Sequence, residues 1–156
     1  MDEGRRFVLR GAGATSALAA ALAAGLLRPE RVLAATWNKA AFAAKDPADA
    51  LKSIGASDAV DSSDVTLDLP EIAENGAVVP IEVSSKVPGT TSIAVLIEKN
   101  PFPLAGQFTF MEGALPYVKL NVKVGQSSRI RVVAEAGGKH YSTAKEVKVT
   151  IGGCGG

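Results

Sequence analysis

Apolar and polar residues alternate along most of the chain beyond residue 64, and a period of two residues predicts β-strands. The alternating runs cover residues 65–69, 79–83, 118–124, 129–132 and 146–151. Residues 92–97 form a nearly continuous apolar run, which is typical of a central strand. Glycine, proline and asparagine turn signals separate the runs. Roughly seven short strands at this spacing predict an all-β fold, an immunoglobulin-like antiparallel β-sandwich with an aliphatic core.

The region before these runs has a helical period. Between residues 37 and 55, apolar positions recur three and four residues apart. Asp46 places a capping carboxylate directly before Pro47, a favoured first helical residue, and Gly55 marks the helix end. We therefore expect a short N-terminal helical segment beside the sandwich. Pro80 lies within an alternating run, so its strand should be an edge or be bulged there.

The first 34 residues have the organisation of an export signal. Arg5 and Arg6 precede an uncharged, alanine-rich run over residues 11–27, and small or β-branched residues lead to a cleavage site after Ala34. The paired arginines are typical of the twin-arginine route, which exports folded proteins. The alternative is a retained membrane anchor, but a spanning helix needs about 20 strongly apolar residues and this run is weakly apolar. We expect residues 1–34 to be a twin-arginine signal peptide and the remainder to work in the periplasm.

Composition narrows the classes of function. The 17 Lys and Arg residues balance 16 Asp and Glu residues, which argues against a nucleic-acid binder that relies on bulk positive charge. One cysteine and one histidine leave no intramolecular disulfide framework and no cysteine-based or paired-histidine metal site. We therefore expect no metal cofactor, and any chemistry must use very few special residues.

The single cysteine stands among glycines, in the run Gly152, Gly153, Cys154, Gly155 and Gly156. Glycine loses more backbone entropy on ordering than any other residue, so residues 152–156 are predicted to form a flexible arm. From Ile151 to Cys154 an extended chain reaches about 10 Å beyond the sandwich. An unused thiol in an oxidising compartment forms disulfides or oxidises, which argues against an accidental cysteine. The sequence predicts a slender arm with an accessible thiol.

The paired-arginine leader, the small β-sandwich and the glycine-flanked Cys154 together resemble the SoxY family, the sulfur-carrier subunits of a thiosulfate-oxidation system, over the whole chain. The resemblance implies that residues 35–151 form an immunoglobulin-like SoxY domain. It also implies that Cys154 carries sulfur intermediates as covalent adducts. The protein would then be a substrate carrier without an active site of its own, and it would bind neither nucleic acid nor, after signal cleavage, a membrane.

The resemblance further implies particular partners. A SoxZ-like subunit would form a heterodimer with this chain and be exported with it. The SoxAX cytochrome would couple thiosulfate to Cys154 oxidatively, and the SoxB hydrolase would release sulfate. A sulfur dehydrogenase, SoxCD, would oxidise the remaining sulfur where the host has one. No charged residue adjoins Cys154 in sequence, so activation of its thiol is expected to come from these enzymes.

Two other classes of function remain open. An exported structural or adhesion module could use Cys154 for an intermolecular disulfide. An enzyme could use Cys154 as a nucleophile, although no histidine or carboxylate lies on the tail to activate it.

The single histidine and several basic residues are further candidates for a catalytic or partner-binding role. His140 is either a general base or, as is usual for one histidine in a strand, a surface or packing residue. Outward-facing basic residues on the predicted strands either guide an anionic partner or form an ordinary solvated face; they are Arg129, Arg131, Lys119 and Lys123.

An acidic cluster and an aromatic cluster are the last candidates for a functional role, as a metal site and as a subunit interface. Metal binding at Asp58, Asp61, Asp64 and Asp68 is disfavoured, because their spacing lacks the ligand pattern and the glycine of an EF-hand loop. Between residues 101 and 111, a proline-rich aromatic loop is a candidate subunit interface, although its side chains suit a core as well. Its members are Phe102, Phe108, Phe110 and Met111, beside Pro101 and Pro103.

Overall fold

The computed structural model describes residues 37–150. The predicted signal peptide, with Arg5 and Arg6, and the predicted carrier arm of residues 152–156 lie outside this range. Within it, no helix is long and apolar enough to cross a membrane.

Two short helices precede nine strands in the described part of the chain. The helices are α2 (Lys39–Ala43) and α3 (Pro47–Ser53). The strands are β1 (Val60–Asp61), β2 (Val65–Asp68), β3 (Ile72–Ala73), β4 (Val79–Ser85), β5 (Thr90–Ile97), β6 (Leu104–Thr109), β7 (Tyr117–Val122), β8 (Ser128–Ala136) and β9 (Lys139–Val149).

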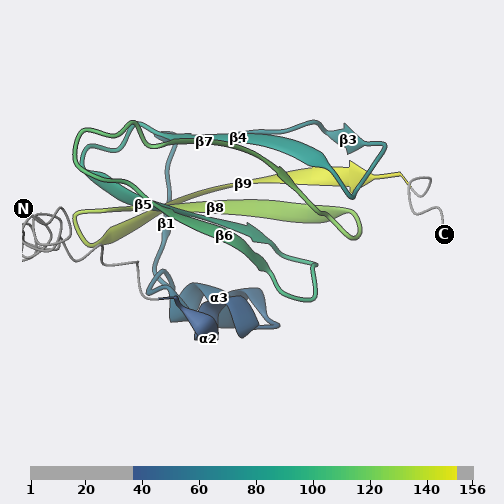
Figure 1. The fold of residues 1–156 in the computed structure, drawn as a ribbon, viewed down its shortest axis with the longest axis horizontal. Helices are drawn as coiled ribbons and strands as arrows, with labels where there is room; N and C mark the ends of the chain where they lie inside the picture. Colours follow the sequence, from purple (N-terminus) through teal and green to yellow (C-terminus); the bar gives the residue numbers. More distant parts are fainter. Residues whose placement is uncertain (1–36, 151–156) are drawn as a thin grey trace, which may run out of the picture. The chain divides into compact units, whose positions relative to one another are not determined.

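The strands form two facing sheets. The larger has the order β1-β9-β8-β5-β6, with β3 paired to the far end of β9, and the smaller has the order β2-β4-β7 (Figure 1). Pairing is antiparallel except where β1 and β3 run parallel to β9. The prediction of an all-β, immunoglobulin-like sandwich is confirmed. The apolar run of residues 92–97 lies in β5, which is central because β6 and β8 flank it.

An aliphatic core fills the space between the sheets. Alternate residues of β8 and β4 turn inward because successive side chains of a strand point to opposite faces. Ile130 and Val132 thus meet Ile81 and Val83, and all four are at most 1% exposed. Burying each such side chain stabilises the fold by about 1.5–3 kcal/mol.

The helices cover part of the outer face of the larger sheet, which makes a third layer (Figure 1). Ala41 and Ala50 contribute the small buried residues of this layer, and Leu96 and Val133 face them from the sheet. The Asp46 side chain accepts a hydrogen bond from the Ala48 amide at 2.7 Å, with Pro47 as the first helical residue. The helical segment and its predicted cap are therefore confirmed.

The structure corrects the sequence-based elements in three places. The proposed proline-rich loop contains β6, an edge strand, and Phe108 and Phe110 pack against the core. In addition, β9 begins at Lys139, directly after the Gly137-Gly138 turn, where polar residues concealed the strand pattern. The prediction of an edge or a bulge at Pro80 is wrong for the strand, because β4 is the central strand of the smaller sheet and pairs with β7 without a register shift. The proline is tolerated because the pairing of β4 with β2 ends at Glu82, two residues away.

Candidate functional site

The structure fixes the point from which the predicted carrier arm leaves the domain. β9 ends at Val149 beside β3 (Figure 1). The Lys148 amide donates to the Glu71 carbonyl oxygen at 2.9 Å, and the Thr150 amide donates to the Ala73 carbonyl oxygen at 3.1 Å. Thr150, the last described residue, is therefore held to the sheet four residues before Cys154. Cys154 itself, with Gly152, Gly153, Gly155 and Gly156, lies outside the described residues.

We call the end of β9, at Val149 and Thr150, the exit point. Its other side is held by the turn after β7. The Val149 amide donates to the Ser127 hydroxyl oxygen at 2.9 Å. Gly76, whose carbonyl accepts from the Val124 amide, packs so closely that a Cβ at its position would overlap the Val124 carbonyl oxygen and lie 2.8 Å from Val149 Cγ1. Close backbone approach explains why glycine is needed here. The exit point is thus set by three separate segments.

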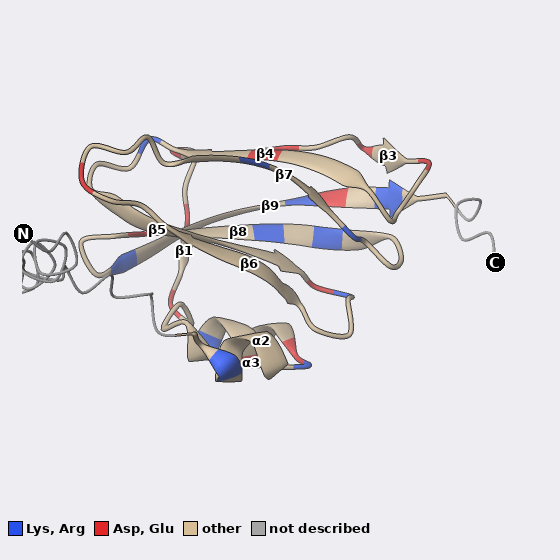
Figure 2. Cartoon of the chain, viewed as in Figure 1, with Lys and Arg blue, Asp and Glu red and all other residues tan. Residues whose placement is uncertain are grey.

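The outer face of the larger sheet carries basic residues and a polar hollow. Figure 2 shows the basic bands along β8 and near the end of β9. Arg129 and Arg131 share a face with Val133, which the helices cover, because alternate residues of a strand point the same way. A hollow of about 420 Å³ lies beside them, and its lining also includes Asp61, Ser62, Ser63, Ser142, Thr143 and Ala144.

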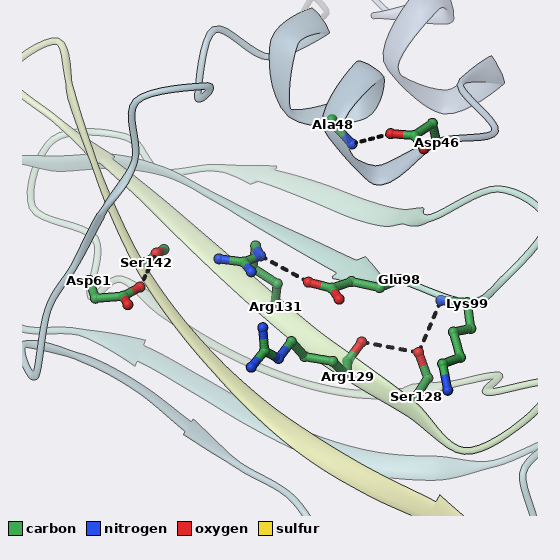
Figure 3. Close-up of polar contacts among 9 residues, drawn as sticks. All are labelled: Asp46, Ala48, Asp61, Glu98, Lys99, Ser128, Arg129, Arg131 and Ser142. Carbon is green, nitrogen blue, oxygen red and sulfur yellow. Dashed lines mark hydrogen bonds and ion pairs between the residues drawn. The ribbon is translucent and has the colours of Figure 1, made fainter.

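The two arginines of this hollow differ in their partners. Arg131 Nε donates to Glu98 Oε1 at 3.1 Å, and both side chains are about three-quarters buried. Arg129 is exposed and forms no ion pair with another described residue. Figure 3 shows both guanidinium groups directed toward the side where the Ser142 hydroxyl donates to Asp61 Oδ1 at 2.7 Å. The hollow therefore offers unused N–H donors next to hydroxyl groups.

A second, smaller hollow of about 330 Å³ lies between Arg129 and the end of β9. It shares Arg129 and is lined further by Lys99, Ser127, Glu146 and Lys148. Ser127 and Lys148 belong to the exit point itself. Polar and charged side chains therefore lie between the end of β9 and Arg129 on this side of the sheet.

The predicted basic surface is not continuous. Lys119 lies on β7 of the smaller sheet, where it pairs with Glu82, while Arg129 and Arg131 lie on the larger sheet. Lys123 follows β7 and is exposed. The Lys119 and Tyr117 hydrogen bonds lower the pKa of the Glu82 carboxyl, and the bond to Glu82 raises the pKa values of both partners. These cations therefore serve two separate surfaces.

The acidic candidates are dispersed as well. In residues 37–150, no three of the His, Cys, Asp and Glu side chains are grouped as a metal site would require. Asp61 accepts from Ser142, and Asp58 lies 3.7 Å from His140 Nδ1. Asp64 and Asp68 are exposed.

His140 is mostly buried, with 13% of its side chain exposed, and lies close to Gly55 at the end of α3. Its surroundings are those of a packing residue.

Only part of the aromatic cluster is available for a partner. Phe102 and Met111 are exposed, whereas Phe108 and Phe110 pack on the core. The interface hypothesis stays a prediction for the exposed pair.

Sequence reasoning missed Glu98 and the exit point. Glu98 is 33 residues from Arg131, and the Glu71 and Ala73 carbonyls meet β9 across more than 70 residues. No local pattern encodes such pairings, since they depend on how the sheets assemble.

Comparisons with known proteins agree with the fold and its predicted family. Residues 51–154 match the family model described as "Sulfur oxidation protein SoxY". The solved structure of the sulfur carrier protein SoxY from Chlorobium limicola f thiosulfatophilum is similar to this chain, with 36% identity and a TM-score of 0.61. That alignment covers 66% of this chain and 94% of the other.

A superoxide reductase (neelaredoxin) from Ignicoccus hospitalis has 18% identity and a TM-score of 0.49, over 64% of this chain and 87% of its own. No curated protein matches the chain significantly. The family match covers more than half of the chain and extends to Cys154, so the chain belongs to the SoxY family of sulfur oxidation proteins.

Proposed function

We propose that this protein is a periplasmic carrier that holds thiosulfate-derived sulfur on the Cys154 thiol and presents it to the enzymes of a Sox system. The observation that carries the proposal is the SoxY family match, which ends at Cys154, together with the 36% identity to a sulfur carrier protein. The twin-arginine pattern at Arg5 and Arg6 supports export in the folded state.

The chemistry requires one accessible thiol. In the loading step, the Cys154 thiolate and thiosulfate form a sulfur–sulfur bond and give up two electrons, which a c-type cytochrome partner such as SoxAX accepts. The product is Cys154–S–S–SO3⁻. In the release step, a hydrolase such as SoxB uses water to cleave the sulfur–sulfur bond to the sulfonate group, which yields sulfate, two protons and the Cys154 persulfide anion. A SoxCD-like dehydrogenase would then oxidise the outer persulfide sulfur to a sulfonate, with three water molecules supplying the oxygen atoms and a cytochrome partner accepting the six electrons.

The architecture suits a carrier. The exit point holds Thr150 to β3, and four chain steps from Thr150 to Cys154 span about 14 Å when extended. Glycines flanking the thiol leave it without bulky neighbours, so it can enter a narrow channel in a partner enzyme. A SoxZ-like subunit is the proposed stable partner, and the enzymes bind in turn.

Intact-mass measurement tests this function directly. Incubation with thiosulfate and the oxidised cytochrome should add the mass of one bound thiosulfate. The hydrolase should then remove the sulfonate group and leave an adduct with the mass of one sulfur atom. The variant Cys154→Ser should gain no mass and should keep the thermal unfolding midpoint of the unaltered chain. A disulfide-linked dimer as the sole product under all conditions would refute the carrier and favour a structural module.

A further inference from the structure

We infer that the free edge of β6 is a self-association surface, at which two copies of this chain pair β6 with β6 in antiparallel orientation and join their larger sheets. The surface includes Phe102 and Met111, the exposed apolar residues on either side of β6. The inference goes beyond the proposed carrier function, because it uses neither Cys154 nor the exit point. In the larger sheet, β8 and β5 lie between β6 and β9, which ends at the exit point.

β6 is an edge strand without the usual protection against pairing. In the described part of the chain it pairs with β5 alone. Natural proteins usually place charged residues or proline on a free edge, and these discourage pairing with another chain. The other edge strands are protected: Asp61 lies on β1, Asp68 on β2 and Lys119 on β7, while β3 has only two residues. β6 has six residues, none of them charged and none a proline, so its edge is open to another strand.

The backbone of β6 has hydrogen-bonding groups on its free side. The Phe110 amide donates to the Thr91 carbonyl oxygen of β5 at 2.9 Å. Successive residues of an antiparallel strand direct their backbone groups to opposite sides. Gln107 and Thr109 therefore direct their N–H and C=O groups away from β5. A row of such groups is complementary to another extended strand, whose backbone offers the same alternation of donors and acceptors.

Apolar side chains follow the same edge. Phe108 and Phe110 pack against the core yet are only half-buried, and the same holds for Leu120 on β7. By contrast, Ile81 on the central strand β4 is 1% exposed. β2 lies over β8 and β9, so β7, the opposite edge of the smaller sheet, lies on the side of β6. The core is therefore incompletely covered between β6 and β7, and a second chain at this edge would bury more apolar surface.

The two ends of β6 are complementary to each other, which favours a second copy of this chain as the occupant. Phe102 lies five residues before Gln107 and Met111 lies four residues after it, and their side chains are 54% and 86% exposed. In two-fold antiparallel pairing centred on Gln107, Met111 of each copy lies beside Phe102 of the other. Lys99 and Glu112, which are exposed beyond the two ends, are then brought together with opposite charges.

The association should be weak. A register shift leaves Ala105 unpaired with β5, so the regular part of the edge is limited to residues 106–109. An interface of one short strand and a few apolar side chains is at the small end of specific protein interfaces. We therefore expect an equilibrium between monomer and dimer at micromolar to millimolar concentrations, in which the monomer remains available to other partners.

Sedimentation equilibrium of the full chain tests the surface. Cys154→Ser is the background for every variant, so that no disulfide can link two copies. The average mass should rise from monomer toward dimer between about 10 μM and about 1 mM, the range of weak association. Gln107→Pro removes the N–H on the free side of β6 and leaves the bonds to β5 in place. It should raise the dissociation constant about tenfold or more, because it also leaves a carbonyl of the second copy unpaired.

Further variants separate backbone pairing from side-chain contacts. Gln107→Ala keeps the backbone N–H and should dimerise like the background. Met111→Lys places a charge beside Phe102 of the second copy and should raise the dissociation constant about tenfold. Val60→Lys is its matched control, because Val60 is also exposed, at 64%, but lies on β1 at the opposite edge of the larger sheet. In hydrogen-exchange NMR, the amides of Gln107 and Thr109 should gain protection as the concentration rises.

Each outcome decides for or against the second copy. A monomer over the whole concentration range would overturn the inference, as would unchanged dimerisation in Met111→Lys, which decides the matter if Gln107→Pro does not fold. An equal loss in Val60→Lys would show a general effect of charge and overturn it as well. If the chain alone is monomeric but a SoxZ-like subunit protects the Gln107 and Thr109 amides, the edge belongs to that subunit and the second copy is refuted. Failure of the partner enzymes to load Cys154 would refute the carrier function and leave this surface intact.

Discussion

At the scale of single residues, Glu82 is the clearest case of one side chain serving two partners. It accepts hydrogen bonds from Lys119 and from the Tyr117 hydroxyl across the β4–β7 pair. All three groups are on the solvent side of the smaller sheet, so their contribution to stability depends on pH and is screened by water and salt.

The direction of the pH dependence follows from the pKa of Glu82. Hydrogen bonds from Lys119 and Tyr117 hold this pKa below its ordinary value of 4.5, so the folded state favours the ionised carboxyl. The resulting stabilisation is present above pH 4.5 and is lost as the pH falls through the lowered pKa. We expect Glu82→Gln to be less stable than the unaltered chain at neutral pH, with the difference disappearing in acid.

Urea unfolding from about pH 7 to about pH 3 measures this difference. Glu112→Gln removes the same charge from the loop after β6 and is the control. A gap between Glu82→Gln and the unaltered chain that stays constant into acid would contradict the assignment.

Residue-scale features could be predicted where their partners are close in sequence. The Asp46 cap was predictable because its acceptor bonds an amide two residues away. The Glu98–Arg131 pair was not, because it joins residues from two strands that meet only in the assembled sheet. Arg129 and Arg131 were recognised as outward-facing, yet their separation from Lys119 depends on which sheet each strand joins.

At the scale of elements, the exit point depends on the short strand β3. Only two residues of β3 pair with β9, in register Ile72↔Lys148 and Ala73↔Val149. So short a pairing needs support from outside the strand, and Gly76 supplies it by packing against Val124 and Val149.

Gly76→Ala should loosen this end of β9. The added Cβ would overlap the Val124 carbonyl oxygen, so the backbone must move, at a cost of about 1–3 kcal/mol in the free energy of unfolding. The Thr150 amide, bonded to Ala73, should exchange with solvent faster. Denaturant unfolding and hydrogen-exchange NMR measure the two effects.

Gly125→Ala is the matched control, because a Cβ there would meet only Asn100 Oδ1, at an ordinary 3.5 Å. Equal behaviour of the two alanine variants would show that Gly76 is not under steric constraint.

Element prediction succeeded where one face of a strand is buried and failed at the sheet edge. β2, β4 and β7 alternate cleanly because they bury one face against the core. β6 lies in the segment that the sequence predicts to be a proline-rich loop, because Pro101 and Pro103 directly precede it. The two-residue strands β1 and β3 were too short to give a period at all.

At the scale of the whole molecule, the sandwich holds the end of β9, and the proposed function assigns the reactive thiol to Cys154, four residues beyond Thr150. The family resemblance was predictable because its signal is local: a pair of arginines before an alanine-rich run, a series of alternating strand patterns and one glycine-flanked cysteine. The hollow of Arg129 and Arg131 was not, since it is lined by residues from the loop after β1 and from strands β8 and β9.

The proposed carrier function predicts that the partner enzymes need a thiol at a distance from the sandwich. A thiol on the surface of the domain should not be sufficient for them. In the double variant Cys154→Ser, Thr150→Cys, the thiol stands on an exposed residue whose amide is bonded to the Ala73 carbonyl. Tetrathionate, a small reagent, should load it at a rate within about tenfold of Cys154, because an exposed thiol needs only its thiolate form to react. The cytochrome and the hydrolase should fail to turn it over, since the thiol has lost the reach of about 14 Å that four residues provide.

Intact-mass kinetics with tetrathionate and with the partner enzymes separate the two steps, and Thr150→Ser with Cys154 retained controls for the altered exit residue. Enzymatic loading of the double variant at the rate of the unaltered chain would show that the partners accept a thiol at the domain surface. In that case the glycine-flanked segment would not be required for reach. Loss of enzymatic loading with retained chemical loading would instead assign the spacing between β9 and Cys154 a function that the thiol alone does not have.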